Sequence, residues 1–233
     1  MNGIIKNFIN DNEHLIDHDD WKTIYENAQI DIVNNYEIGE FTKLILDADI
    51  DPLEYLDRIP IAYLCSTFTD KFDIPDHITS IGSYAFSNTD IKEILIPSNV
   101  KHINNYAFYE CDNLEVVNIQ TGLKALHSGV FSSCYNLKQV NFPTSLTDIG
   151  MNCFRGCIAL PDEIYLTEGL TTIHDGAFDI GSKEGHTYFL PRSLKYIHPN
   201  AFELGSKFVV HENTYAHTFV KSMKDIYDFE VIP

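Results

Sequence analysis

The stretch ITSIGSYAFSNTDIKEILIPSNVKHINNYAFYECDNLEVVNI, residues 78–119, contains the same short pattern twice. In each copy an aliphatic residue is followed three residues later by a second one, and five residues after that by a Phe. Six copies occur, and each Phe follows the previous one by 22, 23, 23, 24 and 24 residues. They are Phe86, Phe108, Phe131, Phe154, Phe178 and Phe202. A constant period of this length identifies a repeat array.

Each repeat predicts two short extended segments joined by a tight turn, with one helical turn at the Ala-Phe step. The residue before each Phe is small or narrow, which allows neighbouring turns to approach closely: Ala85, Ala107, Val130, Cys153, Ala177 and Ala201. A second apolar run follows each Phe, and Pro ends several of these runs because it has no N–H for a strand ladder. One such unit cannot cover its own apolar side, so stacked copies must bury it. The pattern therefore predicts a solenoid.

The quoted stretch resembles the BspA-type leucine-rich repeat, whose unit runs roughly I-x-x-I-x-x-x-A-F-x-x-C-x-x-L-x-x-I-x-I-P. The resemblance covers about residues 59–211. It implies a curved, right-handed solenoid that binds another molecule, and it provides no catalytic residues to transfer. The family occurs on bacterial surface proteins, in some protozoa and in bacteriophage genomes. The fifth and sixth repeats depart from the unit, because Gly181 and Gly205 replace the Cys.

The predicted fold class is an α+β repeat with three parts: an acidic helical N-terminal cap over residues 1–58, a leucine-rich-repeat solenoid over 59–211, and a helix-strand C-terminal cap over 212–233. In the C-terminal cap, Asn213 or Thr214 can begin a short helix through Phe219, and Phe229 and Val231 indicate a last strand. Residues 59–75 form a partial repeat with Leu64 in place of the Phe. The helical segment either covers the open end of the solenoid or forms a separate binding domain, and the two roles are compatible.

The formal charge of −18 is unevenly distributed. Residues 1–70 hold 15 Asp and Glu against 4 Lys and Arg, whereas the remainder holds 19 against 12. Direct binding to nucleic acid is not expected, because it usually requires a basic face that displaces counterions from phosphates. The acidic N-terminal half favours either a protein partner with a basic surface or simple solubility.

The predicted location is the cytoplasm, and the host cytoplasm if the chain is phage-encoded. The start MNGIIKNFINDNEHLID has one Lys and no small-residue cleavage site, so it does not match a secretory signal. No apolar run approaches the length that crosses a bilayer. Neither membrane insertion nor an exported form is therefore expected from the sequence.

The Cys and His residues predict no cofactor, no metal and no enzyme. Cys111, Cys134 and Cys157 each lie three residues after a Phe, so they should stack about 5 Å apart as buried small apolar groups rather than as disulfides or convergent metal ligands. His174 and His198 should lie on adjacent turns near Asp175, as a surface imidazole pair. No motif places a nucleophile beside a base.

Candidate protein-binding residues come from two surfaces. The outward positions of the segments after each Phe mix amides, charges and two aromatic rings, which is typical of interfaces: Glu115, Asn118, Lys138, Asn141, Tyr165 and Phe189. The alternative is that these residues only keep a sheet face soluble. The second surface is a set of N-terminal carboxylates: Asp17, Asp19, Asp20, Asp47, Asp49 and Asp51.

These features favour non-enzymatic recognition of a host or viral protein by a small, phage-encoded type of repeat protein. The first alternative is an acidic inhibitor that mimics the charge of nucleic acid and blocks a host nuclease or defence effector. The second is a virion structural or attachment component. Salt distinguishes the first alternative, because a complex that depends on charge weakens steeply as ionic strength rises.

Overall fold

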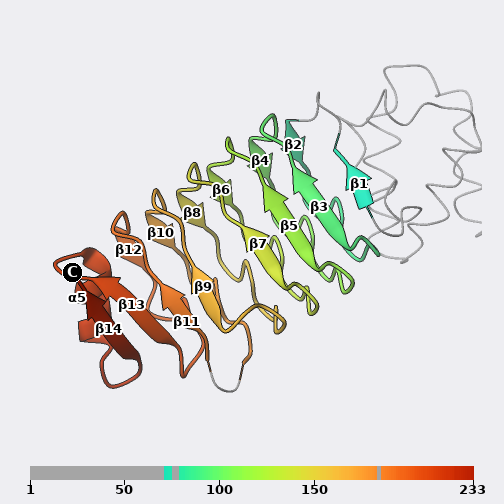
Figure 1. Cartoon of the computed structure of the whole chain (residues 1–233). Coiled ribbons are helices and arrows are strands. Elements are labelled where there is room, and N and C mark those ends of the chain that lie inside the picture. The colour runs from blue at the N-terminus through green and yellow to red at the C-terminus, as the bar shows by residue number, and fades with distance from the viewer. Residues whose placement is uncertain (1–70, 75–78, 183–184) are drawn as a thin grey trace, which may run out of the picture.

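The structure, a computed structural model, describes residues 71–74, 79–182 and 185–233. These residues form an elongated solenoid in which each turn of the chain stacks on the previous one (Figure 1). The predicted N-terminal helices, the six N-terminal Asp residues and most of the partial repeat lie outside the described ranges. In the part that is described, one α-helix accompanies strands and turns, and no helix is long and apolar enough to span a membrane.

One side of the solenoid carries the longer strands in two parallel sheets. The first sheet has the order β1-β3-β5-β7, from β1 (Lys71–Asp73), β3 (Glu93–Ile96), β5 (Val116–Ile119) and β7 (Gln139–Asn141). The second has the order β14-β13-β11-β9, from β9 (Glu163–Tyr165), β11 (Thr187–Phe189), β13 (Lys207–His211) and β14 (Asp228–Ile232). We call the outward side of these two sheets the strand face.

The opposite side carries one continuous sheet of two-residue strands in the order β12-β10-β8-β6-β4-β2. The strands are β2 (Ser80–Ile81), β4 (His102–Ile103), β6 (Ala125–Leu126), β8 (Asp148–Ile149), β10 (Thr172–Ile173) and β12 (Tyr196–Ile197). The second residue of each is a buried Ile or Leu, whereas the first is partly or fully exposed. These aliphatic residues are the ones that recur five residues before each Phe, so the sequence period directly sets this sheet.

The six repeated Phe rings form the predicted column in the core. All six are buried, and neighbouring ring centroids lie 4.7, 5.3, 5.5, 5.2 and 5.5 Å apart in near-parallel stacks. Backbone hydrogen bonds run alongside, as where the Phe108 N–H donates to Val130 O at 2.9 Å and the Phe131 N–H donates to Cys153 O at 2.9 Å. The column is therefore confirmed, together with the small residues that allow the turns to approach.

The Ala-Phe step is a turn rather than the helical turn that the sequence analysis predicts. The residue two positions before the Phe has a positive φ in several repeats: 59° at Tyr84, 59° at Tyr106 and 54° at Asn152. A left-handed residue reverses the chain and stops a right-handed helix from continuing. The direction of the turn thus depends on a backbone conformation that the apolar pattern does not report.

The repeated Cys residues are buried free thiols, as predicted. Each donates to the backbone carbonyl of a repeated Phe, at 2.9 Å for Cys111 to Phe86 O and 3.0 Å for Cys134 to Phe108 O. Burial raises the pKa of the Cys157 thiol to about 12. The Cys157 thiol therefore remains protonated near neutral pH, and it also donates to a repeated Phe, at 3.0 Å to Phe131 O inside the core.

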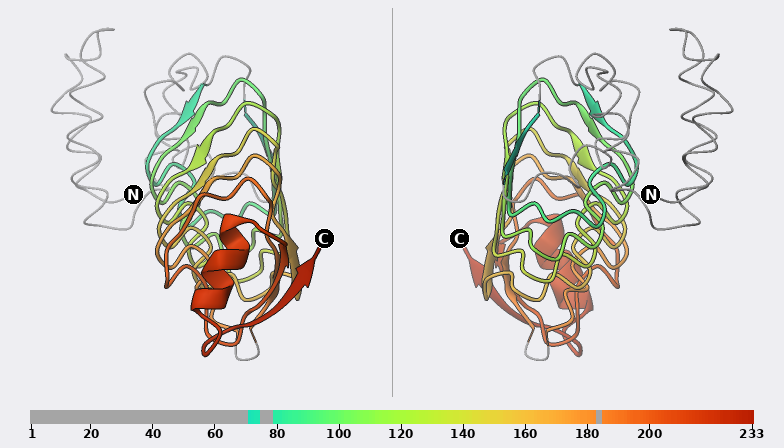
Figure 2. Two further views of the ribbon diagram at one scale, coloured as in Figure 1. Left: turned by 90° about the vertical axis from the view of Figure 1, so that its left-hand side faces the viewer. Right: turned by 90° about the vertical axis from the view of Figure 1, so that its right-hand side faces the viewer.

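A short helix and a last strand close the C-terminal end, as predicted. Thr214 is the N-cap of α5 (Tyr215–Ser222), and its side chain accepts a hydrogen bond from the His217 N–H at 3.2 Å. The helix buries an apolar side that includes Phe219 and Val220. Figure 2 shows α5 lying across the end of the stack, while β14 pairs in parallel with β13.

A charged cluster is buried in the last turns of the solenoid. Glu203 Oε1 lies 2.6 Å from His186 Nδ1, and both side chains are almost fully buried. The Glu203 carboxylate also accepts hydrogen bonds from the Tyr188 hydroxyl at 3.3 Å and from the Ile180 N–H at 3.3 Å. The hydrogen bond to Glu203 raises the pKa of His186, against the opposing effect of burial. This cluster joins the segment before β11 to the last Phe turn.

The His186–Glu203 pair should make stability depend on pH. A raised pKa means that folding favours the protonated imidazole, so the stabilisation is complete below the unfolded pKa of about 6.5 and is lost as pH rises through the folded pKa. We expect the difference in free energy of unfolding between wild type and His186→Gln to be largest at about pH 6 and to decline as the pH rises above the unfolded pKa. Urea denaturation at several pH values measures it. A difference that increases with pH would contradict this assignment.

Candidate functional site

The strand face is interrupted between β7 and β9, which lie on adjacent turns of the chain. In the part of the chain that the structure describes, β7 is the edge of the first sheet, β9 is the edge of the second, and no hydrogen bond joins them. The sheet on the opposite side continues unbroken, because β8 pairs with both β6 and β10. The interruption is therefore a local opening on one side of an otherwise regular stack.

Pro161 and one additional residue explain the interruption. In the preceding turn, the residue after the buried Leu137 is Lys138, whose N–H donates to Glu115 O at 2.9 Å and starts the pairing with β5. The residue after the corresponding Leu160 is Pro161, which has no N–H to donate. The inward-facing strand residue also comes one position later, because Ile164 lies four residues after Leu160, whereas Val140 lies three residues after Leu137. Both changes disfavour the pairing of β9 with β7.

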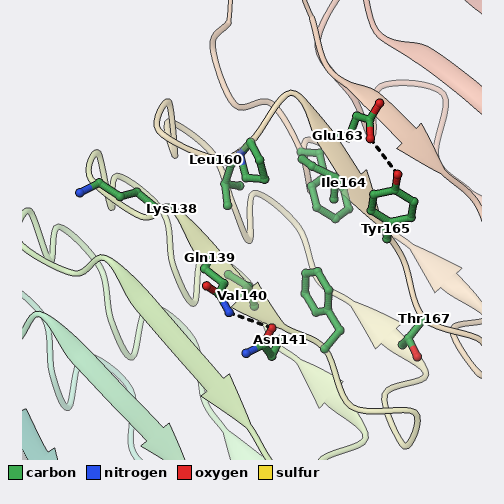
Figure 3. A pocket seen from close by; sticks show the side chains of 12 residues that line it. Lys138, Gln139, Val140, Asn141, Leu160, Glu163, Ile164, Tyr165 and Thr167 are labelled. Atoms are coloured by element: carbon green, nitrogen blue, oxygen red, sulfur yellow. Dashed lines mark hydrogen bonds between the residues drawn. The ribbon is translucent and has the colours of Figure 1, made fainter.

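The interruption leaves a pocket of about 350 Å³, which we call the groove (Figure 3). Apolar side chains form its floor and polar side chains its rim. The groove is lined by Lys138, Gln139, Val140, Asn141, Phe142, Leu160, Pro161, Glu163, Ile164, Tyr165, Thr167 and Phe178. Because Phe178 belongs to the buried ring column, the groove opens directly onto the core.

The charged groups on the rim already have partners within the chain. Lys138 Nζ lies 2.9 Å from Glu115 Oε2 on the β7 side. On the β9 side, the Tyr165 hydroxyl donates to Glu163 Oε2 at 2.7 Å, and this hydrogen bond raises the pKa of Tyr165. The rim thus carries one cation, which is paired with Glu115, and one carboxylate, which accepts a hydrogen bond from a neutral hydroxyl, and it has no excess of either charge.

Two aromatic rings stand on the strand face beside the groove. Tyr165 of β9 pairs in register with Phe189 of β11, and the ring centroids lie 4.1 Å apart with an angle of 11° between the planes. The Tyr165 side of this stack is open to solvent, because the residue is 62% exposed, whereas Phe189 is half-buried. A stacked, exposed aromatic pair on two paired strands offers a rigid apolar contact area.

The structure places the six predicted strand-face residues on the two sides of the groove. Asn118 and Asn141 are in register on β5 and β7, and their amides are hydrogen-bonded to each other. Glu115 and Lys138 form the ion pair just before these strands. Tyr165 and Phe189 lie on the other side. The groove therefore divides the six predicted strand-face residues into two groups. Asp17, Asp19, Asp20, Asp47, Asp49 and Asp51 lie outside the described residues.

The apolar floor of the groove was not predicted from the sequence. Its signal was the Pro directly after a buried Leu, combined with the step from 23 to 24 residues between successive Phe anchors. The predicted imidazole pair proves to be separate from the groove, with His198 Nδ1 lying 3.2 Å from Asp175 Oδ1. Among the described residues, no group of three or more His, Cys, Asp or Glu side chains could hold a metal ion.

Comparison with protein families gives one match. The sequence fits the model described as "BspA type Leucine rich repeat region" in six copies, over residues 59–183 and 127–222. A search of curated proteins gave no match.

Three solved structures resemble the fold. The pneumococcal vaccine antigen PcpA has a TM-score of 0.55 and 16% identity, over 70% of this chain and 41% of that one. A leucine-rich repeat protein of T. pallidum has a TM-score of 0.50 and 23% identity, over 69% of this chain and 85% of that one. A leucine-rich repeat protein from Bacteroides ovatus has a TM-score of 0.48 and 23% identity, over 69% of this chain. The match spans about half (47%) of the length of that protein. At these identities the likeness to the first two structures shows the fold alone.

Proposed function

The chain belongs to the BspA-type leucine-rich repeat family, and we propose that it recognises another protein, without catalysis, through its strand face. The observation that carries this proposal is the exposed Tyr165 ring, stacked on Phe189 at 4.1 Å beside an apolar groove. Exposed aromatic anchors next to a pocket are the usual centres of binding energy in protein interfaces. Leucine-rich repeat proteins typically mediate contacts between proteins, which agrees with this use of the face.

The rigidity of the strands supports the same proposal. Tyr165 and Phe189 are held by backbone pairing between β9 and β11, and β11 is in turn paired with β13. Association therefore orders few additional groups, and less of the interaction energy is lost as conformational entropy. The polar residues on the other side of the groove, such as Asn118 and Asn141, suit the rim of an interface.

The acidic N-terminal half supplies the second candidate function. Residues 1–70 carry 15 acidic against 4 basic side chains, which would suit a partner with a basic surface, such as a nuclease that the chain inhibits by charge mimicry. Under this second proposal the complex weakens steeply between low and moderate ionic strength. A complex that forms through the aromatic pair and the groove is much less sensitive to salt. The partner in either case is proposed to be a host or viral protein in the cytoplasm.

Removal of the aromatic pair tests the proposed function. The immobilised wild-type chain is used to capture a partner, and the purified partner is then titrated against the double variant Tyr165→Ala and Phe189→Ala. We expect affinity to fall by at least about thirtyfold, because the loss of even one anchor of this kind costs about 2 kcal/mol. The matched control is Tyr196→Ala, since Tyr196 is an exposed Tyr on β12 of the opposite sheet. Equal affinity of the double variant and the control would reject the strand face as the binding surface.

A further inference from the structure

The groove leaves the edge of β7 without the cover that the next turn gives to β5. One turn earlier, the core residues Val117 and Ile119 of β5 are 0% and 6% exposed, because the next turn pairs with β5 and covers them. The equivalent residues of the following turn, Val140 and Phe142, are only half-buried. The same type of side chain at the same place in the repeat is therefore left partly open where the pairing stops.

The backbone of β7 also presents an open edge to the groove. Successive residues of a strand direct their N–H and C=O groups alternately to the two sides. The Gln139 N–H donates to Glu115 O at 3.1 Å, so Gln139 and Asn141 face β5. The N–H and C=O of Val140 must then face the groove, where the described residues provide no strand partner. An extended backbone is the ligand that complements such an edge.

The opposite wall of the groove has the same character. The Leu166 N–H donates to Phe189 O at 3.1 Å, and Asp162 O accepts from the Thr187 N–H at 2.8 Å, so these residues face β11. The backbone groups of Glu163 and Tyr165 therefore face away from β11, towards the groove. The exposed Tyr165 ring stands above this wall and can cover a segment lying below it.

From these observations we propose that the groove binds an extended, uncharged segment of a partner protein, which pairs its backbone with the edge of β7 and inserts alternate apolar side chains over Val140 and Phe142. This inference rests on the proposed function and names the chemistry of its ligand. The rim favours neither sign of charge, because it carries one cation, Lys138, and one anion, Glu163, each with a contact inside the chain. A charged side chain would have to displace one of these contacts.

Deletion of Pro161 tests the proposal, because it restores the spacing of the preceding turn. In the shortened chain, Ile164 lies three residues after Leu160, as Val140 lies three residues after Leu137. The residue after the buried Leu160 is then Asp162, which has an N–H to donate. We expect β9 to pair with β7 and to fill the groove. The probes are random dodecapeptides displayed on phage, selected on the wild-type chain with counter-selection on the shortened one. Selected peptides should be uncharged, alternate apolar with polar residues, and bind wild type at least about tenfold more tightly.

Modified peptides make the test independent of how the shortened chain folds. Alternate amides of an extended peptide point to opposite sides, so only every second N–H can pair with β7. N-methylation of these amides should weaken binding to wild type at least about tenfold. N-methylation of the other amides should change binding less than about twofold. Equal binding to both chains, insensitivity to N-methylation in both registers, or no enriched peptide would overturn the proposal. A dimer of wild type that the deletion abolishes would also overturn it, since the occupant would then be a second copy.

The two proposals fail in different ways. In one outcome, the double variant Tyr165→Ala and Phe189→Ala loses affinity for the partner while the Pro161 deletion keeps it. That result would retain the strand face as the interface and reject the inserted segment. Unchanged partner affinity in the aromatic variant would reject the strand face. Loss of affinity in both variants, together with the register effect of N-methylation, supports both.

Discussion

Phe131→Ala is expected to lower the free energy of unfolding by about 4 kcal/mol. The Phe131 ring is fully buried between two others, with its centroid 5.3 Å from that of Phe108 and 5.5 Å from that of Phe154. Truncation leaves a cavity inside the ring column, and the backbone hydrogen bonds between turns limit how far the neighbouring rings can move to fill it. Equilibrium unfolding in urea measures the loss.

The control for Phe131→Ala is Tyr135→Ala. Tyr135 lies four residues later in the same repeat and is 45% exposed, so its truncation should change stability by less than about 1 kcal/mol. A loss below about 1 kcal/mol for Phe131→Ala as well would mean that the column does not hold the solenoid together.

Glu203→Ala is expected to cost about 3–5 kcal/mol, because it removes one partner of a buried charged pair. The His186 ring, the Tyr188 hydroxyl and the Ile180 N–H would each lose their acceptor in a place that water does not reach. Polar groups that are buried without a partner are among the largest sources of destabilisation by single substitutions. Urea unfolding followed by tyrosine fluorescence measures the change.

The control for Glu203→Ala is Glu230→Ala on β14, where the side chain is exposed. Its effect should remain within about 0.5 kcal/mol. If the two variants were equally stable, the buried cluster would be dispensable for the last turns. His186→Gln should be intermediate, because the other donors to Glu203 remain.

The parts of the fold that follow from repetition were predictable from the sequence. The same residue types return at nearly constant spacing, so the ring column, the buried thiols and the two sides of the solenoid could be derived from the period. The C-terminal cap was predictable for a different reason: the period stops there, and Thr214 is a good N-cap residue. Where the sequence supplies no repetition, prediction was weaker.

The groove and the buried charge could not be derived from the period. A single Pro and one extra residue can produce either a bulge or a break, and the outcome depends on whether the neighbouring turns can still pair. Glu203 directly follows a repeated Phe, at a place where other repeats have Ser87 or Arg155, so the pattern does not indicate a buried carboxylate. The structure places His186 beside it, although 17 residues separate the two in the sequence.

Four of the six predicted strand-face residues lie on strands: Asn118, Asn141, Tyr165 and Phe189. Their role in binding stays a prediction. The sequence does not show that Tyr165 and Phe189 stack on each other, nor that the groove separates them from Asn118 and Asn141. Both facts depend on the register between turns, which is set by the lengths of the loops.

Amide hydrogen exchange of the wild-type chain, with and without its captured partner, tests the central claim most directly. Binding at the strand face predicts slower exchange at Val140, Glu163 and Tyr165, whose N–H groups face the groove. Exchange should be unchanged in the opposite sheet, which consists of β2, β4, β6, β8, β10 and β12. Slower exchange confined to that opposite sheet, or to residues 1–70, would contradict recognition through the strand face.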